Sequence, residues 1–231
     1  MTPTSTPALP SSAALPSKSP RGAERWLLMD YNGVIGRQPT AAHWSQLRDS
    51  VGWAHGAEDF ESTFWAERLA YDAGQITDGQ FWQRVLGRSL PSGDLLHTVA
   101  VDAAMWLHTD ERVLDLLRTV AARGIGVAML SNAPVPVAEA IAAAPWSTVF
   151  GGHLAFSAHL GVNKPDPEAY TGALRLMGDP DPGTVLFVDD RADNVAAARA
   201  LGIHAVHYTG GGDLHAAVSA HLSPAQGAMS M

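Results

Sequence analysis

Several polar side chains in this sequence follow short apolar runs, at positions where carboxylates can do chemistry. Asp30 follows the run Trp26–Met29. Asp189 and Asp190 follow the run Thr184–Val188. A carboxylate is already ionised at neutral pH, so Asp30 can attack phosphorus or carbon without a partner base. Two adjacent carboxylates are costly unless a cation joins them, and a hard ion such as Mg²⁺ prefers oxygen ligands. These aspartates therefore predict a nucleophile beside a metal site.

Two further residues are suited to the charge of an anionic substrate. Ser131 follows the apolar run Ile125–Leu130, and its hydroxyl can donate a hydrogen bond to a transferred phosphoryl oxygen. Lys164 lies in the segment Asn163–Pro167, where two prolines fix the backbone. A lysine on so stiff a loop can neutralise both the nucleophile and the substrate.

The elements that position these residues follow an alternating pattern of strands and helices. The apolar runs predict strands that are buried on both faces, and a fourth, weaker run covers His204–Tyr208. Asp110 can cap a helix that ends at Gly124, and a compact helix is expected over Asn194–Leu201. This alternation is typical of an α/β fold with a parallel sheet. Open sheets of this kind place their ligands at the carboxyl ends of the strands, where the polar residues stand.

Residues 40–105 have a different character. They hold four of the seven tryptophans and contain no run typical of a buried strand. We interpret this segment as a small helical subdomain inserted after the first strand, with its aromatic side chains packed as a core instead of forming a ligand-stacking surface. The helical pairs that indicate it are Phe60 with Phe64, Trp65 with Leu69, and Phe81 with Val85.

Composition excludes several classes of function. The 231 residues carry a net charge of −8 and no cysteine, so disulfide scaffolds, thiol nucleophiles and cysteine-ligated zinc are excluded. The few basic residues do not cluster, which disfavours nucleic-acid binding. No apolar run is long enough to cross a membrane. We expect a cytoplasmic protein that takes a small-molecule substrate as a monomer or homodimer, without nucleic-acid or membrane partners. Residues 1–22 and 223–231 are expected to be disordered tails.

The order and spacing of the motifs resemble those of the haloacid dehalogenase-like hydrolase superfamily. Asp30 and Ser131 are 101 residues apart, Lys164 follows after 33, and Asp190 after another 26. The stretches L-S-N-A-P, N-K-P-D-P-E-A-Y and F-V-D-D-R-A-D-N are close to the family's form. The resemblance implies a Rossmann-like core over residues 23–39 and 106–222, with a helical cap over residues 40–105.

The resemblance also implies a role for each motif residue that faces the substrate. Asp30 would be the nucleophile, and Ser131 would bind the phosphoryl group. Lys164 would neutralise charge and bind the substrate. Asn132 would lie at the same substrate site and, like Asn194, would organise the loops by hydrogen bonds.

For the metal, the resemblance implies Mg²⁺ held by three oxygen donors. These are the carboxylates of Asp30 and Asp190 and the backbone carbonyl of Asn32. Adjacent residues on a strand point to opposite faces, so Asp189 and Asp190 cannot both bind the ion in the same way. The family pattern implies that Asp190 binds it directly and that Asp189 reaches it through water.

One position departs from the phosphatase pattern. Phosphatases of this superfamily carry a second aspartate two residues after the nucleophile, where it protonates the leaving oxygen, whereas this chain has Asn32. An amide has no proton to exchange at neutral pH. The 2-haloacid dehalogenases have tyrosine there and generally lack the aspartate pair, because they use no metal. The sequence predicts a Mg²⁺-dependent hydrolase of a small phosphorylated metabolite, acting through an aspartyl intermediate. Two alternatives stay open: a 2-haloacid dehalogenase, and a catalytically weakened binding or regulatory protein.

Overall fold

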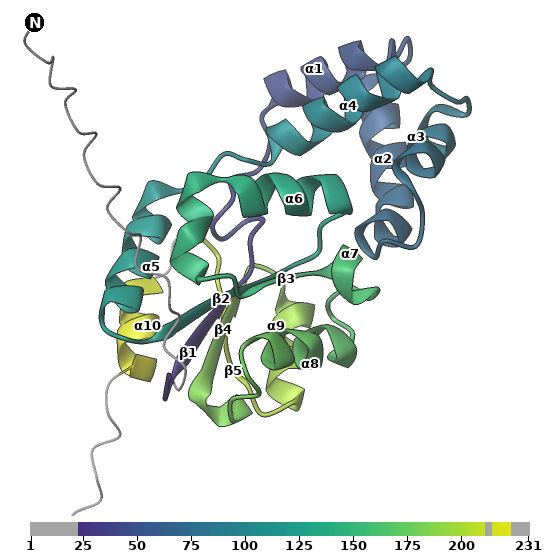
Figure 1. The fold of residues 1–231 in the computed structure, drawn as a ribbon. Coiled ribbons are helices and arrows are strands. Elements are labelled where there is room, and N and C mark those ends of the chain that lie inside the picture. The colour runs from purple at the N-terminus through teal and green to yellow at the C-terminus, as the bar shows by residue number, and fades with distance from the viewer. Residues whose placement is uncertain (1–22, 211–213, 223–231) are drawn as a thin grey trace, which may run out of the picture.

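A parallel β-sheet forms the centre of the molecule (Figure 1). The computed structural model describes residues 23–210 and 214–222, and the predicted tails lie outside these residues. The strand order is β3-β2-β1-β4-β5, and every neighbouring pair is parallel, which confirms the expected α/β class. The strands are β1 (Trp26–Met29), β2 (Gly126–Ser131), β3 (Leu154–Phe156), β4 (Val185–Asp189) and β5 (His204–His207).

The strands differ from the sequence prediction in three respects, the smallest being that β5 ends at His207, one residue before the end of its predicted run. The edge strand β3 was not predicted, because three residues are too few to give a periodic signal. In addition, β2 and β4 each end one residue later than their apolar runs. Ser131 pairs with Phe156 of β3, and Asp189 pairs with His207 of β5. Both polar residues are therefore held by the sheet itself.

Helices cover both faces of the sheet, as the alternation of side chains along β1 requires. Leu27 and Met29 point into a core with α5, α6 and α10, whereas Trp26 and Leu28 point into a core with α8 and α9. These elements, with the shorter helical turns between them, are α5 (Glu111–Ala122), α6 (Val135–Ala143), η1 (Pro145–Phe150), α7 (Ser157–Leu160), α8 (Pro167–Leu176), η2 (Pro182–Thr184), α9 (Ala192–Ala200) and α10 (Leu214–Leu222).

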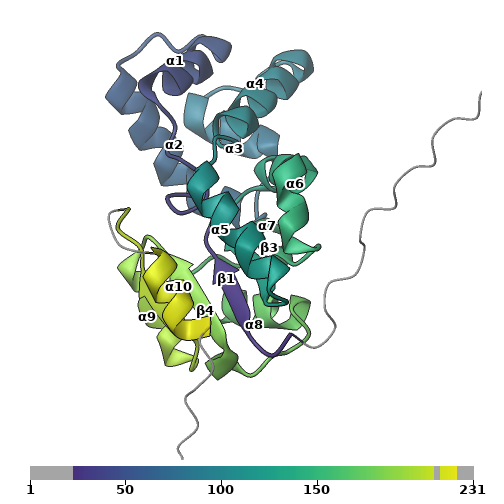
Figure 2. The same cartoon turned by 90° about the vertical axis from the view of Figure 1, so that its left-hand side faces the viewer.

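The segment between β1 and α5 forms four helices that project from the sheet as a separate group (Figures 1 and 2). We call this group the cap. Phe60, Phe64 and Phe81 are fully buried in it, but Trp65 is 46% exposed and Leu69 is 70% exposed. The sequence predicted that Trp65 and Leu69 pack in the core of this segment, and for this pair the prediction is wrong. The cap helices are α1 (Ala41–Ser50), α2 (Ala57–Asp72), α3 (Asp78–Leu86) and α4 (Ser92–Met105).

Two linkers join the cap to the core, and they run side by side. Gly36 and Thr109 form an antiparallel bridge. The Arg37 N–H donates to the carbonyl of His108 at 2.7 Å. The chain therefore leaves the core and returns to it at one place.

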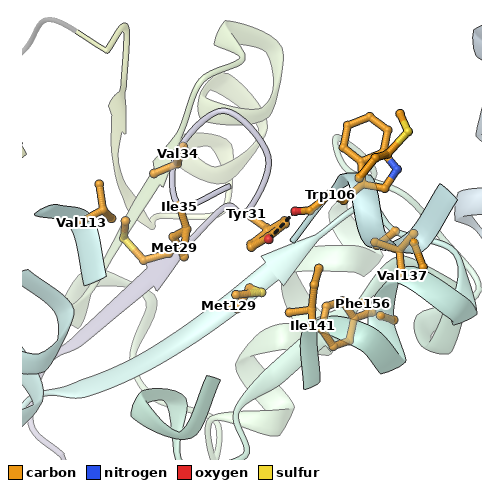
Figure 3. Packing of buried hydrophobic residues seen from close by; sticks show 14 of the residues in the cluster. Met29, Tyr31, Val34, Ile35, Trp106, Val113, Met129, Val137, Ile141 and Phe156 are labelled. Atoms are coloured by element: carbon orange, nitrogen blue, oxygen red, sulfur yellow. Dashed lines mark hydrogen bonds between the residues drawn. The ribbon is translucent and has the colours of Figure 1, made fainter. Parts of the chain in front are cut away.

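Tyr31, directly after the candidate nucleophile, ties the turn that follows β1 to the second linker. Its hydroxyl donates to the carbonyl of Trp106 at 2.6 Å, as Figure 3 shows. Its ring stacks on Trp146 with the centres 5.7 Å apart. The described part of the chain contains no helix long and apolar enough to cross a membrane.

Candidate active site

The sheet brings the predicted site residues together at one edge. Asp30 directly follows β1, Ser131 is the last residue of β2, and Asp189 is the last residue of β4. Because β1 lies between β2 and β4, these three carboxyl ends are neighbours. Lys164 lies in the loop before α8 and is buried. Its ammonium group contacts Asp30 after β1 and Asp189 at the end of β4.

The ammonium of Lys164 lies between two carboxylates. Its Nζ is 2.6 Å from Asp30 Oδ1 and 2.7 Å from Asp189 Oδ2. Burial lowers the pKa of Lys164, but the two carboxylates outweigh this and raise it, so the lysine stays charged. The side chain of Asn132 holds the loop: its Nδ2 donates to the Lys164 carbonyl at 2.9 Å, and its Oδ1 accepts from the Lys164 N–H at 2.8 Å.

Asp189 is fully buried, and both its oxygens are engaged. Asn194 Nδ2 donates to them at 3.0 and 3.1 Å, and the N–H of Arg191 donates to Oδ1 at 2.8 Å. With the contact to Lys164, these bonds satisfy the carboxylate. The geometry suits Asp189 to positioning Lys164, and its predicted water-mediated contact with a metal stays a prediction.

Three carboxylates crowd around this single lysine. Asp30, Asp189 and Asp190 each offer an oxygen within 4.8 Å of the others. Burial raises the pKa of Asp30 to about 7, and Asp189 and Asp190 add to the effect while Lys164 opposes it. Burial and the neighbouring Asp189 also raise the pKa of Asp190. One ammonium does not balance three carboxylates, so the site favours a further cation.

The turn after β1 places a further oxygen atom, from the side chain of Asn32, near the three carboxylates. Gly33 has a φ of +84°, and a Cβ atom there would lie 2.2 Å from Asp190 Oδ2. Only glycine therefore lets this turn approach Asp190. The side-chain oxygen of Asn32, in the same turn, is buried and has no hydrogen-bond partner among the described residues. Carboxylate and amide oxygens are the donors that Mg²⁺ prefers, so the residues fit that ion.

A small cavity next to this site lies between the core and the cap. Asn32, Ser131 and Asn132 line it from the core, and Trp65 and Arg68 are among the cap residues that line it. The cap residues were not predicted as site residues. The sequence pairs Trp65 with Leu69 at helical spacing, but this spacing does not tell which side of the helix faces a cavity.

A comparison of the sequence with known protein families agrees with this fold and site. Residues 23–202, more than half of the chain, match the haloacid dehalogenase-like hydrolase family. The chain belongs to this family. As a haloacid dehalogenase-like hydrolase, it shows the Rossmann-like sheet that the resemblance implied.

The proteins similar to this hydrolase include a phosphatase, which is similar in sequence, and a dehalogenase, which is similar in fold. The sesquiterpene phosphatase astK of Aspergillus oryzae is 28% identical over 153 residues, which are 60% of this chain and 77% of that protein. The HAD family enzyme bt-2542 of Bacteroides thetaiotaomicron, solved with magnesium and inorganic phosphate, is 20% identical; the match has a TM-score of 0.66 and covers 84% of this chain and 98% of that one. The L-2-haloacid dehalogenase of Xanthobacter autotrophicus is 18% identical, with a TM-score of 0.57, covering 78% and 76% of the two chains. These two structures share the fold.

Proposed function

We propose that this hydrolase is a Mg²⁺-dependent phosphatase of small phosphorylated metabolites, in which Asp30 is the nucleophile. The observation that carries the proposal is that three carboxylates have oxygens within 4.8 Å of one another, while one lysine contacts two of them. Such a site suits a divalent cation together with a phosphoryl group. The phosphatase among the relatives supports the same assignment.

Asp30 is oriented through one of its two oxygens. Oδ1 accepts from the Tyr31 N–H at 2.7 Å and from Lys164 at 2.6 Å. Oδ2 accepts neither bond, so we assign it as the oxygen that attacks phosphorus. The bond from phosphorus to the leaving oxygen then breaks, and its electron pair stays on that oxygen. Water afterwards cleaves the aspartyl phosphate, which releases inorganic phosphate and restores the carboxylate.

The remaining site residues would stabilise the negative charge of the phosphoryl group. Ser131 would donate to a phosphoryl oxygen, and Lys164 would offset the negative charge that the substrate brings. Mg²⁺ would be held by Asp30, Asp190 and the carbonyl of Asn32, and when bound it would neutralise phosphoryl oxygens.

The test is hydrolysis of acetyl phosphate and para-nitrophenyl phosphate with and without Mg²⁺. We expect turnover only with Mg²⁺ and its loss in Asp30→Asn, because an amide cannot act as the nucleophile. Asp115→Asn, which changes an exposed aspartate on α5, is the matched control and should retain turnover. Absence of turnover in the wild type would favour the binding-protein alternative, and release of halide from a 2-halo acid would favour the dehalogenase.

A further inference from the structure

The cavity between the cap and the core has an apolar part built from three separate elements. Trp65 comes from α2, Trp106 from the second linker and Val137 from α6. The polar core residues Ser131 and Asn132 line the same cavity. A phosphoryl group held at Ser131 would therefore have its organic part directed among indole rings and a valine.

The charged cap residues in the cavity are already paired. Arg68 Nε lies 2.6 Å from Asp72 Oδ1, and Arg68 Nη1 lies 3.4 Å from Asp102 Oδ2. The guanidinium also lies 5.4 Å from the centre of the Trp106 ring. Because these groups satisfy one another, this wall is poorly suited to binding the hydroxyls of a sugar, which would have to compete with an ion pair.

The apolar lining continues outward along α2. Trp65 is 46% exposed, and Leu69, one turn further on, is 70% exposed, although the other aromatic rings of α2 are buried. The carbonyl of Leu69 accepts from Asn163 Nδ2 at 2.8 Å, so this turn of α2 lies beside the loop that carries Lys164. The cavity is small, about 40 Å³, so a longer group must extend past Trp65.

We propose that Trp65, Trp106 and Val137 bind a hydrocarbon group of the substrate, so that among phosphate esters of alcohols the enzyme prefers those whose alcohol is apolar. This inference rests on the proposed phosphatase function and specifies its substrate class. Burial of apolar surface is favourable in proportion to area, and an indole ring offers a large flat face for it. Trp65, half exposed at the mouth of the cavity, is the residue we assign as the main determinant of this preference.

The test uses methyl-, butyl- and octylphosphonate, whose carbon–phosphorus bond is not hydrolysed, in titration calorimetry with Mg²⁺. Affinity should rise with chain length, by about threefold to fourfold for each methylene that becomes buried. The dependence should be weaker in Trp65→Leu and lost in Trp65→Ala. Trp53→Ala is the control, because Trp53 belongs to the same cap and packs on Phe60 but does not line the cavity.

The outcomes separate this inference from the phosphatase function. Equal affinity for methyl- and octylphosphonate, or no binding of any phosphonate, overturns the inference even where acetyl phosphate is hydrolysed. A dependence on chain length without turnover of any phosphate upholds the apolar subsite and overturns the phosphatase function. An unchanged dependence in both Trp65 variants, with melting temperatures near that of the wild type, overturns the role of Trp65.

Discussion

Asn32 decides which leaving groups the candidate site can expel. Its amide stands two residues after Asp30, and its side-chain oxygen is buried without a hydrogen-bond partner in the described part of the chain. An amide cannot protonate a departing oxygen, so an alkoxide would have to leave unprotonated. Carboxylates and aryl oxides are stable anions and need no such help. For the proposed phosphatase we therefore expect faster turnover of acyl and aryl phosphates than of alkyl phosphates, and the preference for apolar alcohols concerns only the choice among alkyl phosphates.

We expect Asn32→Asp to raise turnover of alkyl phosphates by about 10²-fold, because it supplies the missing acid. Turnover of acetyl phosphate should change much less. Steady-state kinetics on both substrates measure the difference, and Asn163→Asp, which adds the same charge beside Lys164, is the control. Asn32-Gly33 is prone to deamidation, so the mass of the fresh protein must be verified. Equal alkyl phosphate turnover in the fresh wild type and in Asn32→Asp would contradict the prediction.

The buried carboxylate of Asp30 predicts that metal binding depends on pH. Burial raises its pKa to about 7, so part of the metal-free protein carries a proton there at neutral pH. Mg²⁺ favours the ionised form, so its affinity should increase from about pH 6 to about pH 8, with release of a proton. Calorimetry in buffers of different ionisation enthalpy detects that proton. Asp190→Ala should lose binding and Asp115→Ala should keep it; an affinity independent of pH would contradict the prediction.

At the scale of the elements, Arg68 joins two helices of the cap. It lies on α2 and pairs with Asp72 of the same helix and with Asp102 of α4. Arg68 and Asp102 are buried, and the side chain of Asp72 is 14% exposed. Burial raises the pKa of both Asp72 and Asp102, although Arg68 opposes this rise. Each carboxylate thus depends on the guanidinium to stay ionised inside the cap.

Arg68→Met should destabilise the protein by about 3–5 kcal/mol, because it leaves the buried carboxylate of Asp102 and the largely buried carboxylate of Asp72 without their cation. Their pKa values would rise further above the unfolded value near 4, so the folded variant would bind protons that the unfolded chain does not. Its stability should therefore recover as the pH falls from about 8 to about 5.5 and decrease again as the pH rises. Urea unfolding at both pH values measures this.

The matched control for Arg68→Met is Arg84→Met, which breaks a more exposed pair with Glu67 in the same cap. Its cost should stay below about 1 kcal/mol at both pH values. A loss of stability in Arg68→Met that does not change with pH would show that packing, and not charge, explains the role of Arg68.

At the scale of the whole molecule, a few hydrogen bonds link the cap and its linkers to the core. Tyr31 donates to the carbonyl of Trp106, Asn163 donates to the carbonyl of Leu69, and Ser157 donates to the carbonyl of Asp72. Each donor lies on the core side, close to the candidate site. The position of the cap is thus coupled to the same turn and loops that carry Asp30 and Lys164.

Tyr31→Phe should destabilise the protein by about 1–3 kcal/mol, because the carbonyl of Trp106 loses its donor. Tyr170→Phe removes a comparable buried bond to the carbonyl of Asn194, at 2.8 Å within the core, and serves as the control. Both variants should unfold more easily, but only Tyr31→Phe should speed hydrogen exchange in residues 106–110. Equal exchange in the two variants would contradict a specific role for Tyr31 in holding the linker.

Much of the sheet and its polar ends was predictable because buried parallel strands are continuous apolar runs that stop abruptly, as at Asp30.

The cap residues that line the cavity could not be predicted from the sequence. Trp65 and Phe64 are adjacent on one helix, yet only the packing of other elements decides which of them is buried. The burial of Arg68 depends on Asp102, which lies 34 residues away and gives no local signal.

The bridge between Gly36 and Thr109 brings the two ends of the inserted segment together. Because these ends are neighbours in space, we expect that an insert of another length can join the core at the same place, provided that its own ends meet. The pairing of β1 with β2 does not involve the insert, and the register of the sheet is kept whatever its length. We therefore expect that an insert of another sequence, grafted between residues 36 and 109, changes which compounds reach the candidate site while Asp30 and Lys164 keep their positions.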